Sequence, residues 1–118
     1  MIDSFVHSSA YCNNTDLAEN AAIYKNCHVE NCCLASHATI GDDSRVFYCN
    51  LEEYTALQRY NMLYYTNIGR FTYTGRNFTS FHSNIGSFCS ISWNVSIGGG
   101  STILIVLLHI LFCMHQIM

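Results

Sequence analysis

The feature of this sequence that most constrains its fold is a 17-residue period in the aliphatic side chains. Successive aliphatic positions are separated by six, six and five residues, and this order repeats from Val6 to Ile97. The first hundred residues contain sixteen Val, Ile and Leu residues, and fourteen of them fall on this lattice, whereas Ile2 and Val95 do not. Because neither a helix nor strand alternation has this spacing, it predicts a chain that turns three corners in every coil. The lattice positions are Val6, Cys12, Leu17, Ile23, Val29, Leu34, Ile40, Val46, Leu51, Leu57, Leu63, Ile68, Thr74, Ser80, Ile85, Ile91 and Ile97.

One coil of this size cannot bury its inward aliphatic residues alone, so the coils must stack on one another. Stacking at roughly 4.8 Å forms a continuous aliphatic column and completes the backbone ladders between coils. We therefore predict an all-β fold, a parallel β-helix of about five and a half coils between residues 6 and 97.

The seven cysteines follow the same frame, because most positions four residues after a lattice position are small. Cys12 takes an aliphatic position, and Cys27, Cys33 and Cys89 take small ones. We interpret the cysteines as small apolar residues with free thiols in a reducing cytoplasm, rather than as a disulfide scaffold. The cluster of Cys27 and His28 with Cys32 and Cys33 resembles a metal site but lacks a second ligand pair, so we predict no metal. The small positions are Ala10, Ala21, Cys27, Cys33, Ala38, Ser44, Thr55, Thr72, Cys89 and Val95.

The short corner of each coil carries residues that recur at 17, namely Asp16, Cys33, Asn50, Asn67 and Asn84. Asn and Asp tolerate the left-handed backbone region, so we expect that conformation here, with ladder hydrogen bonds between stacked Asn side chains. Glycine follows a lattice isoleucine where the chain begins to turn. Those glycines are Gly41, Gly69, Gly86 and Gly98.

Some residues break the pattern of an aliphatic interior and a polar surface. Tyr54, Phe71 and Phe88 recur at 17 off the lattice, and they form either a subunit interface or an exposed aromatic flank. Thr74 and Ser80 place hydroxyls in the aliphatic column, where we expect them to bond to the backbone or to weaken the coil.

The stretch "TNIGRFTYTGRNFTSFHSNIGSFCSISWNVSIGGG", residues 66–100, repeats hexads of the form aliphatic-Gly-x-x-small-x. It resembles the hexapeptide-repeat acyltransferases, and most closely their branch of chloramphenicol and xenobiotic acetyltransferases. The resemblance implies a left-handed parallel β-helix, a homotrimer, and acetyl-CoA lying along the groove between neighbouring prisms. It further implies an O-acetyltransferase that acts on a sugar or another hydroxyl acceptor, with no permanently bound cofactor. The same prism also serves as a non-catalytic scaffold or binding protein, and this alternative stays open.

In that family a His just past the glycine run acts as general base on the acceptor hydroxyl. The corresponding position here is Thr102, and an alcohol is a poor base near neutral pH, so we predict no catalytic residue and an impaired chain. His82 is the candidate replacement base, although a place at the surface or a corner fits it better. We interpret His28 and His37 as solvent-facing, and the adjacent Asp42 and Asp43 as a solvated turn.

The sequence changes character at residue 101, so we divide it into a repeat domain, 1–100, and an apolar tail, 101–118. Codons allowed for the tail, read one base back, permit the family's continuation, including a Lys-His pair and a later His-Pro-Phe. We therefore interpret the tail as a frameshift or truncation product. A helix that caps the open end of the prism is the alternative. A membrane anchor fits less well, because the apolar run is short and interrupted by His109.

Overall charge excludes one further class of function. A net charge of −3 with 11% charged residues lacks the basic surface of a nucleic-acid-binding protein. The first ten residues do not form a signal peptide, so we expect a cytoplasmic protein. We therefore interpret the Asn-x-Ser/Thr triplets at Asn13, Asn77 and Asn94 as turn residues rather than glycan sites.

The interpretation of the tail makes a prediction about the gene. The coding DNA after the Gly100 codon, read in a frame shifted by one base, should encode Lys-His and then His-Pro-Phe at the family's spacing. Sequencing that region tests this expectation directly. If no shifted frame encodes the pattern, the frameshift interpretation fails and the capping helix gains support.

Overall fold

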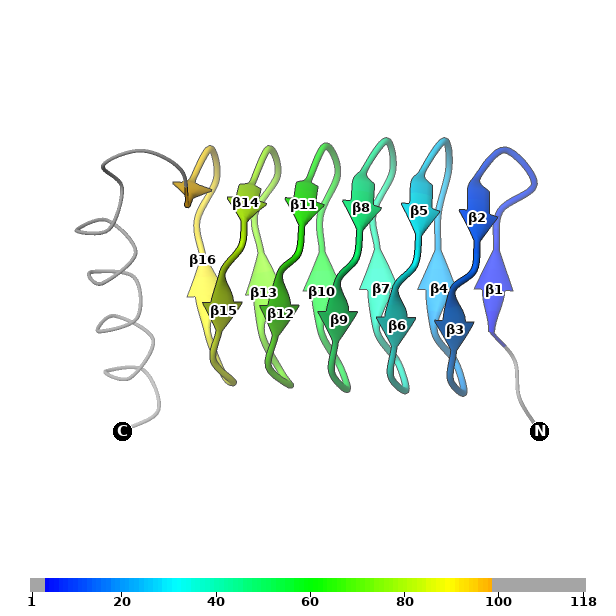
Figure 1. Ribbon diagram of the computed structural model, residues 1–118, viewed down its shortest axis with the longest axis horizontal. Coiled ribbons are helices and arrows are strands. Elements are labelled where there is room, and N and C mark those ends of the chain that lie inside the picture. The colour runs from blue at the N-terminus through cyan, green and yellow to red at the C-terminus, as the bar shows by residue number, and fades with distance from the viewer. Residues whose placement is uncertain (1–3, 99–118) are drawn as a thin grey trace.

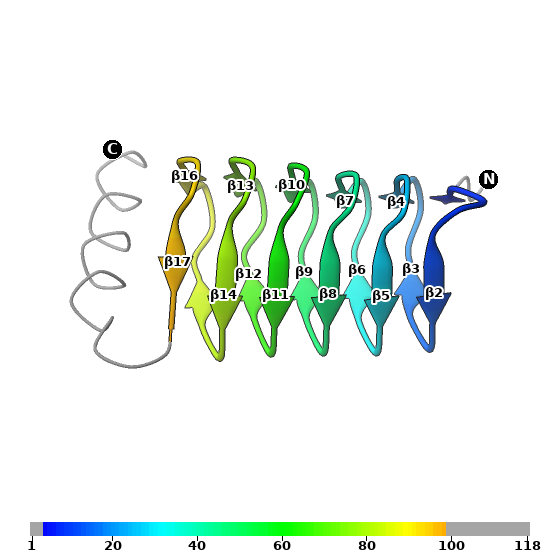
Figure 2. The same cartoon turned by 90° about the horizontal axis from the view of Figure 1, so that it is seen from above.

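The computed structural model describes residues 4–98, and this part of the chain forms a prism of short parallel strands wound about one axis (Figure 1). Its strands form three sheets, one on each side of the prism (Figure 2). The first sheet contains β1 (Phe5–Val6), β4 (Ala22–Ile23), β7 (Thr39–Ile40), β10 (Ala56–Leu57), β13 (Tyr73–Thr74) and β16 (Ser90–Ile91). The second contains β2 (Tyr11–Asn13), β5 (His28–Glu30), β8 (Arg45–Phe47), β11 (Met62–Tyr64), β14 (Thr79–Phe81) and β17 (Ser96–Ile97). The third contains β3 (Asp16–Leu17), β6 (Cys33–Leu34), β9 (Asn50–Leu51), β12 (Asn67–Ile68) and β15 (Asn84–Ile85).

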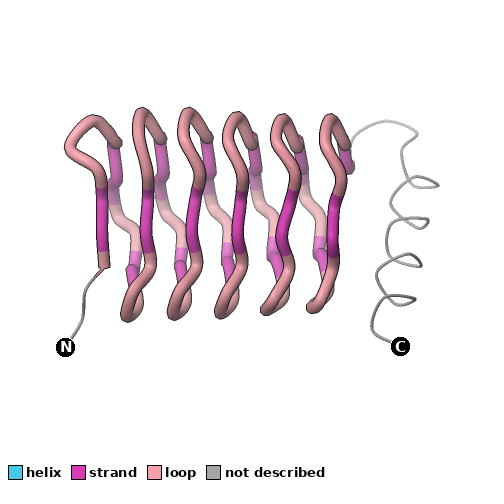
Figure 3. The backbone as a smooth tube through the Cα atoms, turned by 180° about the vertical axis from the view of Figure 1, so that it is seen from behind, coloured by secondary structure: helices cyan, strands magenta, loops and turns pink. Residues whose placement is uncertain are grey.

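Every strand pairs in parallel with the strand one coil away, in a register of 17 residues. Val6 lies beside Ile23, for example, and Ile68 beside Ile85. In Figure 1 the chain descends on the near side and rises on the far side while it advances toward its C-terminal end, so the coil is left-handed. Figure 3 shows the same successive coils from behind. The predicted all-β, left-handed parallel β-helix with 17-residue coils is therefore confirmed.

The aliphatic lattice forms the core, as predicted. Every lattice position from Ile23 to Ile97 is buried, including the hydroxyl-bearing Thr74 and Ser80. Val6 is 38% exposed because it lies in the first coil, which has a neighbouring coil on one side only. The core is a single column, so each inward residue depends on the coils above and below it.

Most of the small positions are also buried, Ala10 and Val95 are half-buried, and one position needs a correction. Cys33 is exposed in β6, whereas the preceding Cys32 is buried, and so are Cys49 and Thr66 at equivalent places in later coils. At the short corner the inward small position lies three residues after the lattice position, because this corner has one residue fewer. The rule of four residues holds at the other two corners, as Ala38 and Ser44 show.

Buried polar side chains at the corners satisfy backbone groups that the strand ladders leave unpaired. Ser44 Oγ accepts a hydrogen bond from Asn61 N–H one coil later, at 3.2 Å, and donates to the carbonyl of Gln58. Thr72 Oγ1 likewise accepts from the N–H of Cys89 at 3.1 Å. The lattice hydroxyls bond to side chains rather than to the backbone: Thr74 Oγ1 donates to Asn61 Oδ1 at 2.6 Å, and Ser80 Oγ lies 2.9 Å from Thr66 Oγ1. The alternative, that they weaken the coil, stays a prediction.

The backbone turns each corner through one residue in the left-handed region. These residues recur with the same spacing of six, six and five. The predicted corner residues Asp16, Asn50, Asn67 and Asn84 instead lie in strands, so that prediction is wrong. The predicted Asn ladder does occur, since Asn67 Nδ2 donates to Asn84 Oδ1 at 2.7 Å. The left-handed residues other than glycine are Asn14, Asn20, Asn26, Asn31, His37, Asp43, Tyr48, Tyr54, Tyr60, Tyr65, Phe71, Asn77, His82, Phe88 and Asn94.

These corner residues include aromatic side chains that stack from coil to coil. His37, Tyr54, Phe71 and Phe88 form one ladder, with ring centroids 4.5 to 5.3 Å apart and nearly parallel planes. Tyr48, Tyr65 and His82 form a second at 4.8 Å. A bulky residue is unfavourable in the left-handed region, and ring stacking at about 0.5–1.5 kcal/mol per pair offsets part of that cost. The flank of exposed aromatics is thus present, and its use as a subunit interface stays a prediction.

Close approach between coils requires glycine at some, but not all, of the positions that follow a lattice isoleucine. A Cβ atom on Gly41 would lie 2.6 Å from the backbone carbon of Gln58. A Cβ atom on Gly86 would meet no described atom within 4 Å. Neither Gly41 nor Gly86 has a positive φ, so backbone conformation does not separate them.

We predict that Gly41→Ala destabilises the fold by about 1–3 kcal/mol, because the added methyl group forces adjacent coils apart. Gly86→Ala is the matched control and should be neutral or slightly stabilising, since Ala reduces the entropy of the unfolded chain. Urea unfolding followed by circular dichroism measures both changes. Equal losses in the two variants would contradict the close-packing account.

We also predict that Ser44→Ala destabilises the protein by about 1–3 kcal/mol, because it leaves the buried N–H of Asn61 without an acceptor. Ser83→Ala removes a hydroxyl whose hydrogen bond to the Phe81 carbonyl is exposed, so it should cost much less. The same unfolding measurement compares the two. An equal cost would show that corner hydroxyls do not act by satisfying the backbone.

Candidate functional site

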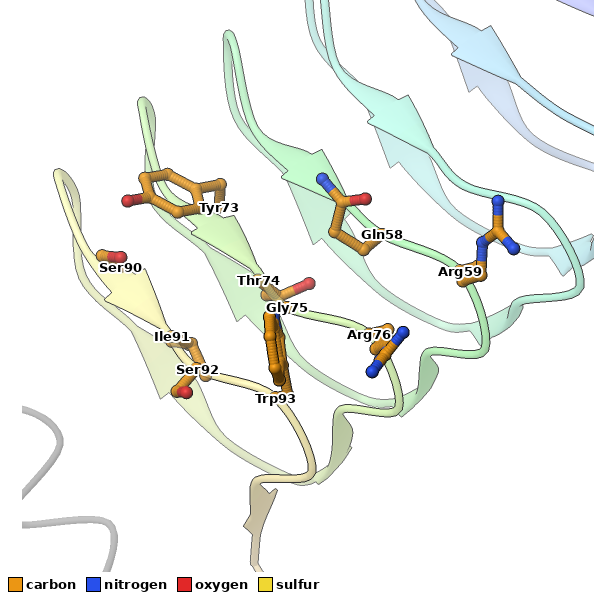
Figure 4. A pocket seen from close by; sticks show the side chains of 10 residues that line it. All are labelled: Gln58, Arg59, Tyr73, Thr74, Gly75, Arg76, Ser90, Ile91, Ser92 and Trp93. Atoms are coloured by element: carbon orange, nitrogen blue, oxygen red, sulfur yellow. The ribbon is translucent and has the colours of Figure 1, made fainter.

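A groove of about 640 Å³ lies over the outer face of the first sheet, toward the C-terminal end of the prism. Strands β13 and β16 supply its floor, and the turns after β10, β13 and β16 supply one wall (Figure 4). Residues of three successive coils therefore meet in one place, because the 17-residue register stacks equivalent positions. The lining residues are Gln58, Arg59, Tyr73, Thr74, Gly75, Arg76, Ser90, Ile91, Ser92 and Trp93.

Two arginines give the groove its charge. Arg59 and Arg76 occupy equivalent positions in successive coils, so their side chains leave the same corner of the prism. The one ion pair among residues 4–98 joins His28 to Glu30, and hence neither guanidinium pairs with a carboxylate in this part of the chain. Two adjacent, unpaired guanidinium groups favour an anionic ligand with several oxygen acceptors, such as a phosphate.

Trp93 continues the column of the two arginines by one more coil. Its side chain is 63% exposed, and the Arg76 guanidinium carbon lies 4.8 Å from the ring centroid. The ring packs against Gly75, where a Cβ atom would come within 2.4 Å of Trp93 Cδ1. Glycine at this position thus lets the indole lie close to the sheet. An exposed indole beside a cation offers a stacking surface for a planar group.

The remaining lining residues are neutral and polar. Tyr73, Ser90 and Ser92 contribute hydroxyls, and Gln58 contributes an amide. Among residues 4–98, no His, Asp, Glu or Cys lines the groove. These side chains offer hydrogen-bonding groups to a ligand, but none of them is suited to remove a proton near neutral pH.

The histidines predicted from the sequence lie away from this groove. His82 stacks on Tyr65 at the corner between the second and third sheets, which agrees with the corner interpretation. His28 is half-buried between the rings of Tyr11 and Phe47, and its Nε2 lies 2.5 Å from Glu30 Oε2.

The prediction that His28 and His37 face solvent holds only in part, because both are half-buried. His37 is stacked on Tyr54, and its Nε2 lies 3.2 Å from Asn20 Nδ2. The acidic pair does form a turn: Asp42 Oδ1 accepts the Lys25 N–H at 3.0 Å, and Asp43 is a left-handed corner residue. Thr102 and the tail 101–118 lie outside the described residues.

The metal-like cluster is dispersed by the fold. Cys27 and Cys32 are buried at different corners, Cys33 is exposed, and His28 is in β5. Burial raises the pKa of the Cys27 thiol, so the thiol stays protonated. A protonated, buried thiol agrees with a structural role. Within residues 4–98, no group of three or more His, Cys, Asp or Glu side chains is placed to hold a metal ion. The same stretch contains no helix long and apolar enough to cross a membrane.

Sequence reasoning missed the groove, although a signal for it was present. Arg59, Arg76 and Trp93 follow one another at intervals of 17, the same interval as the core lattice. This shared interval is sufficient to place the three side chains in one column on the outside of the prism.

Comparison with known proteins identifies the fold. No family model and no curated protein sequence matches the chain. Among solved structures, the acetyltransferase domain of PglB from Neisseria gonorrhoeae FA1090 matches with a TM-score of 0.79 and 16% identity, over 82% of this chain and 50% of that one. A mutant of perosamine N-acetyltransferase from Caulobacter crescentus, in complex with CoA and GDP-perosamine, matches with a TM-score of 0.74 and 14% identity, over 80% and 48%.

A third match is a structure of two proteins in complex. The CcmM N-terminal domain in complex with CcmN has a TM-score of 0.53 and 12% identity, over 83% of this chain and 98% of that one. The chain spans about half the length of the two acetyltransferase structures. Resemblance to the chloramphenicol and xenobiotic branch stays a prediction. In its fold, the chain is a hexapeptide-repeat β-solenoid of the kind found in these acetyltransferases.

Proposed function

We propose that this chain derives from an acetyl-CoA-dependent acetyltransferase that acts on a sugar, and that its groove binds the donor. The observation that carries the proposal is the pair of unpaired arginines beside an exposed tryptophan, on a fold shared with a structure that holds CoA. CoA carries phosphates and an adenine ring, which match the guanidinium groups of Arg59 and Arg76 and the indole of Trp93.

The proposed reaction transfers an acetyl group from the CoA thioester to a hydroxyl of the acceptor. A base removes the hydroxyl proton, the oxygen attacks the thioester carbonyl, and the CoA thiolate leaves. The groove can orient the donor, but its lining supplies no base. With Thr102 at the position of the family's His, we expect donor binding to persist while transfer is impaired. An amino group of a sugar is the alternative acceptor, as the name perosamine N-acetyltransferase suggests.

Other parts of the proposal follow the family resemblance. The protein forms a homotrimer in the cytoplasm, with the repeat domain ending at residue 100 and the apolar tail playing no part in catalysis. Acetyl-CoA acts as a substrate and no permanently bound cofactor or metal is needed.

A second candidate function is that of a non-catalytic scaffold. The match to CcmM in complex with CcmN favours it, because that structure shows a solenoid of this kind bound to another protein. The two candidates differ in what the groove does: a scaffold has no need of unpaired arginines beside an indole. Binding of CoA therefore separates them.

We predict that Arg59→Gln and Arg76→Gln each weaken CoA binding about 10- to 100-fold, because each loses a charge-assisted hydrogen bond. Trp93 is the single tryptophan of the chain, so its fluorescence reports binding at the groove. Arg70→Gln is the matched control and should bind as the unchanged protein does, because Arg70 does not line the groove. Equal affinity of all three variants would exclude the groove as the donor site.

We further predict that release of free CoA thiol from acetyl-CoA, with sugars bearing hydroxyl or amino groups, is slow or undetectable in this chain. The reason is the absence of the general base, a group that contributes typically 10²- to 10⁴-fold to such reactions. A chain in which Thr102→His is introduced serves as the comparison. Rapid turnover by the unchanged chain would contradict the importance of that position.

A further inference from the structure

The buried pair Cys32 and Cys49 lies one coil apart at the short corner between the second and third sheets. Both side chains belong to one inward column whose other members are Thr15, Thr66 and Ser83. In each of these residues the hydroxyl or thiol donates to the carbonyl two residues earlier. Cys32 Sγ lies 3.1 Å from the Glu30 oxygen, and Cys49 Sγ lies 3.2 Å from the Phe47 oxygen. The two thiols therefore point the same way and stack directly.

We propose that Cys32 and Cys49 form an oxidation site, at which hydrogen peroxide converts the two thiols into a disulfide that links consecutive coils. This inference is independent of the acetyltransferase proposal. It rests on the contact between the two residues: the N–H of Cys49 donates to Cys32 Sγ at 3.4 Å.

The spacing between successive coils is suitable for a disulfide bond between Cys32 and Cys49. Neighbouring parallel strands lie roughly 4.7–4.9 Å apart, and disulfides join Cα atoms roughly 4.4–6.8 Å apart. The adjoining residues confirm the register, since Cys33 N–H donates to the Cys49 carbonyl at 3.0 Å and Cys33 pairs with Asn50. No change of register is needed to bring the sulfurs together.

The other free cysteines lack a thiol neighbour in their own columns. Cys12 lies beside Val29, Cys33 lies between Asp16 and Asn50, and Cys27 is followed one coil later by Ser44. A disulfide between any two of them would need a change in the fold, whereas Cys32 and Cys49 are already stacked.

The two cysteines also have different chemical roles. The adjacent Cys49 thiol lowers the pKa of Cys32, and so does the N–H that Cys49 donates to the Cys32 sulfur, against the opposing effect of burial. The adjacent Cys32 side chain and burial raise the pKa of Cys49. We assign Cys32 as the nucleophile, because the N–H that Cys49 donates to its sulfur stabilises a thiolate there.

Oxidation of the two thiols to a disulfide takes two steps. The Cys32 thiolate attacks one oxygen of hydrogen peroxide, the O–O bond breaks, and a hydroxide leaves to become water, giving a sulfenic acid. The sulfur of Cys49 then attacks the Cys32 sulfur, and the S–O bond breaks. The departing hydroxide takes the Cys49 proton to form a second water. Two electrons pass from the thiols to the peroxide, which is small enough to reach a buried corner when it opens locally.

Peptide mapping of the full chain tests the site. Folded protein is treated with hydrogen peroxide near neutral pH, free thiols are then alkylated, and trypsin cuts after the basic residues. The segment 26–45 contains Cys27, Cys32 and Cys33, whereas 46–59 contains Cys49 alone. We expect these two segments to be joined, with fragmentation placing the bond at Cys32.

Matched serine variants identify the partner, and serine already occupies this column at Ser83. Cys32→Ser should abolish the linked product, and Cys33→Ser should leave its yield unchanged. Circular dichroism confirms that each variant is folded. Recovery of Cys49 alkylated after peroxide treatment, or linked to Cys27 or Cys33, would overturn the proposal.

A third variant tests the geometry itself. Thr66→Cys in the Cys32→Ser background moves the pair one coil along the same column, so 46–59 should now link to the segment 60–70. Absence of that link in a folded protein would show that column stacking does not support the bond.

Discussion

The structure depends on the backbone ladder between successive coils. Each coil pairs with the next through parallel strands only two or three residues long, and the register of 17 never changes from β1 to β17. The ladder continues through the corners, where a left-handed residue donates its N–H to the preceding coil, as Tyr48 does to Glu30 and Tyr65 to Phe47. The core, the aromatic ladders and the groove all follow from this one repeated pairing.

Because the ladder fixes every position, each column of the prism acts as a separate environment. Inward columns take aliphatic residues, and corner columns take small residues that satisfy a backbone N–H, such as Ser44. Outward columns are not constrained by the core and carry the functional side chains. One contains two arginines and a tryptophan, and three others contain stacked aromatic rings. The proposed oxidation site arises in the same way, where two successive members of a corner column are cysteines.

The sequence was sufficient to predict the fold, because side-chain direction is encoded in aliphatic spacing and the spacing is regular. It was insufficient for the corners, where Tyr54 and Phe71 adopt a backbone conformation that their own preferences disfavour. There the inter-coil hydrogen bonds override local propensity, and Asn67, which suits such a turn, lies in a strand. The groove also escaped prediction, since exposed residues carry no hydrophobic signal even when they share the period.

We propose that this prism presents a phosphate-binding groove built from three stacked coils. A crystal structure of the full chain soaked with CoA is the decisive test. We expect electron density for the phosphates at the guanidinium groups of Arg59 and Arg76, with the adenine against Trp93. Well-ordered CoA elsewhere on the prism, with this groove empty, would contradict it.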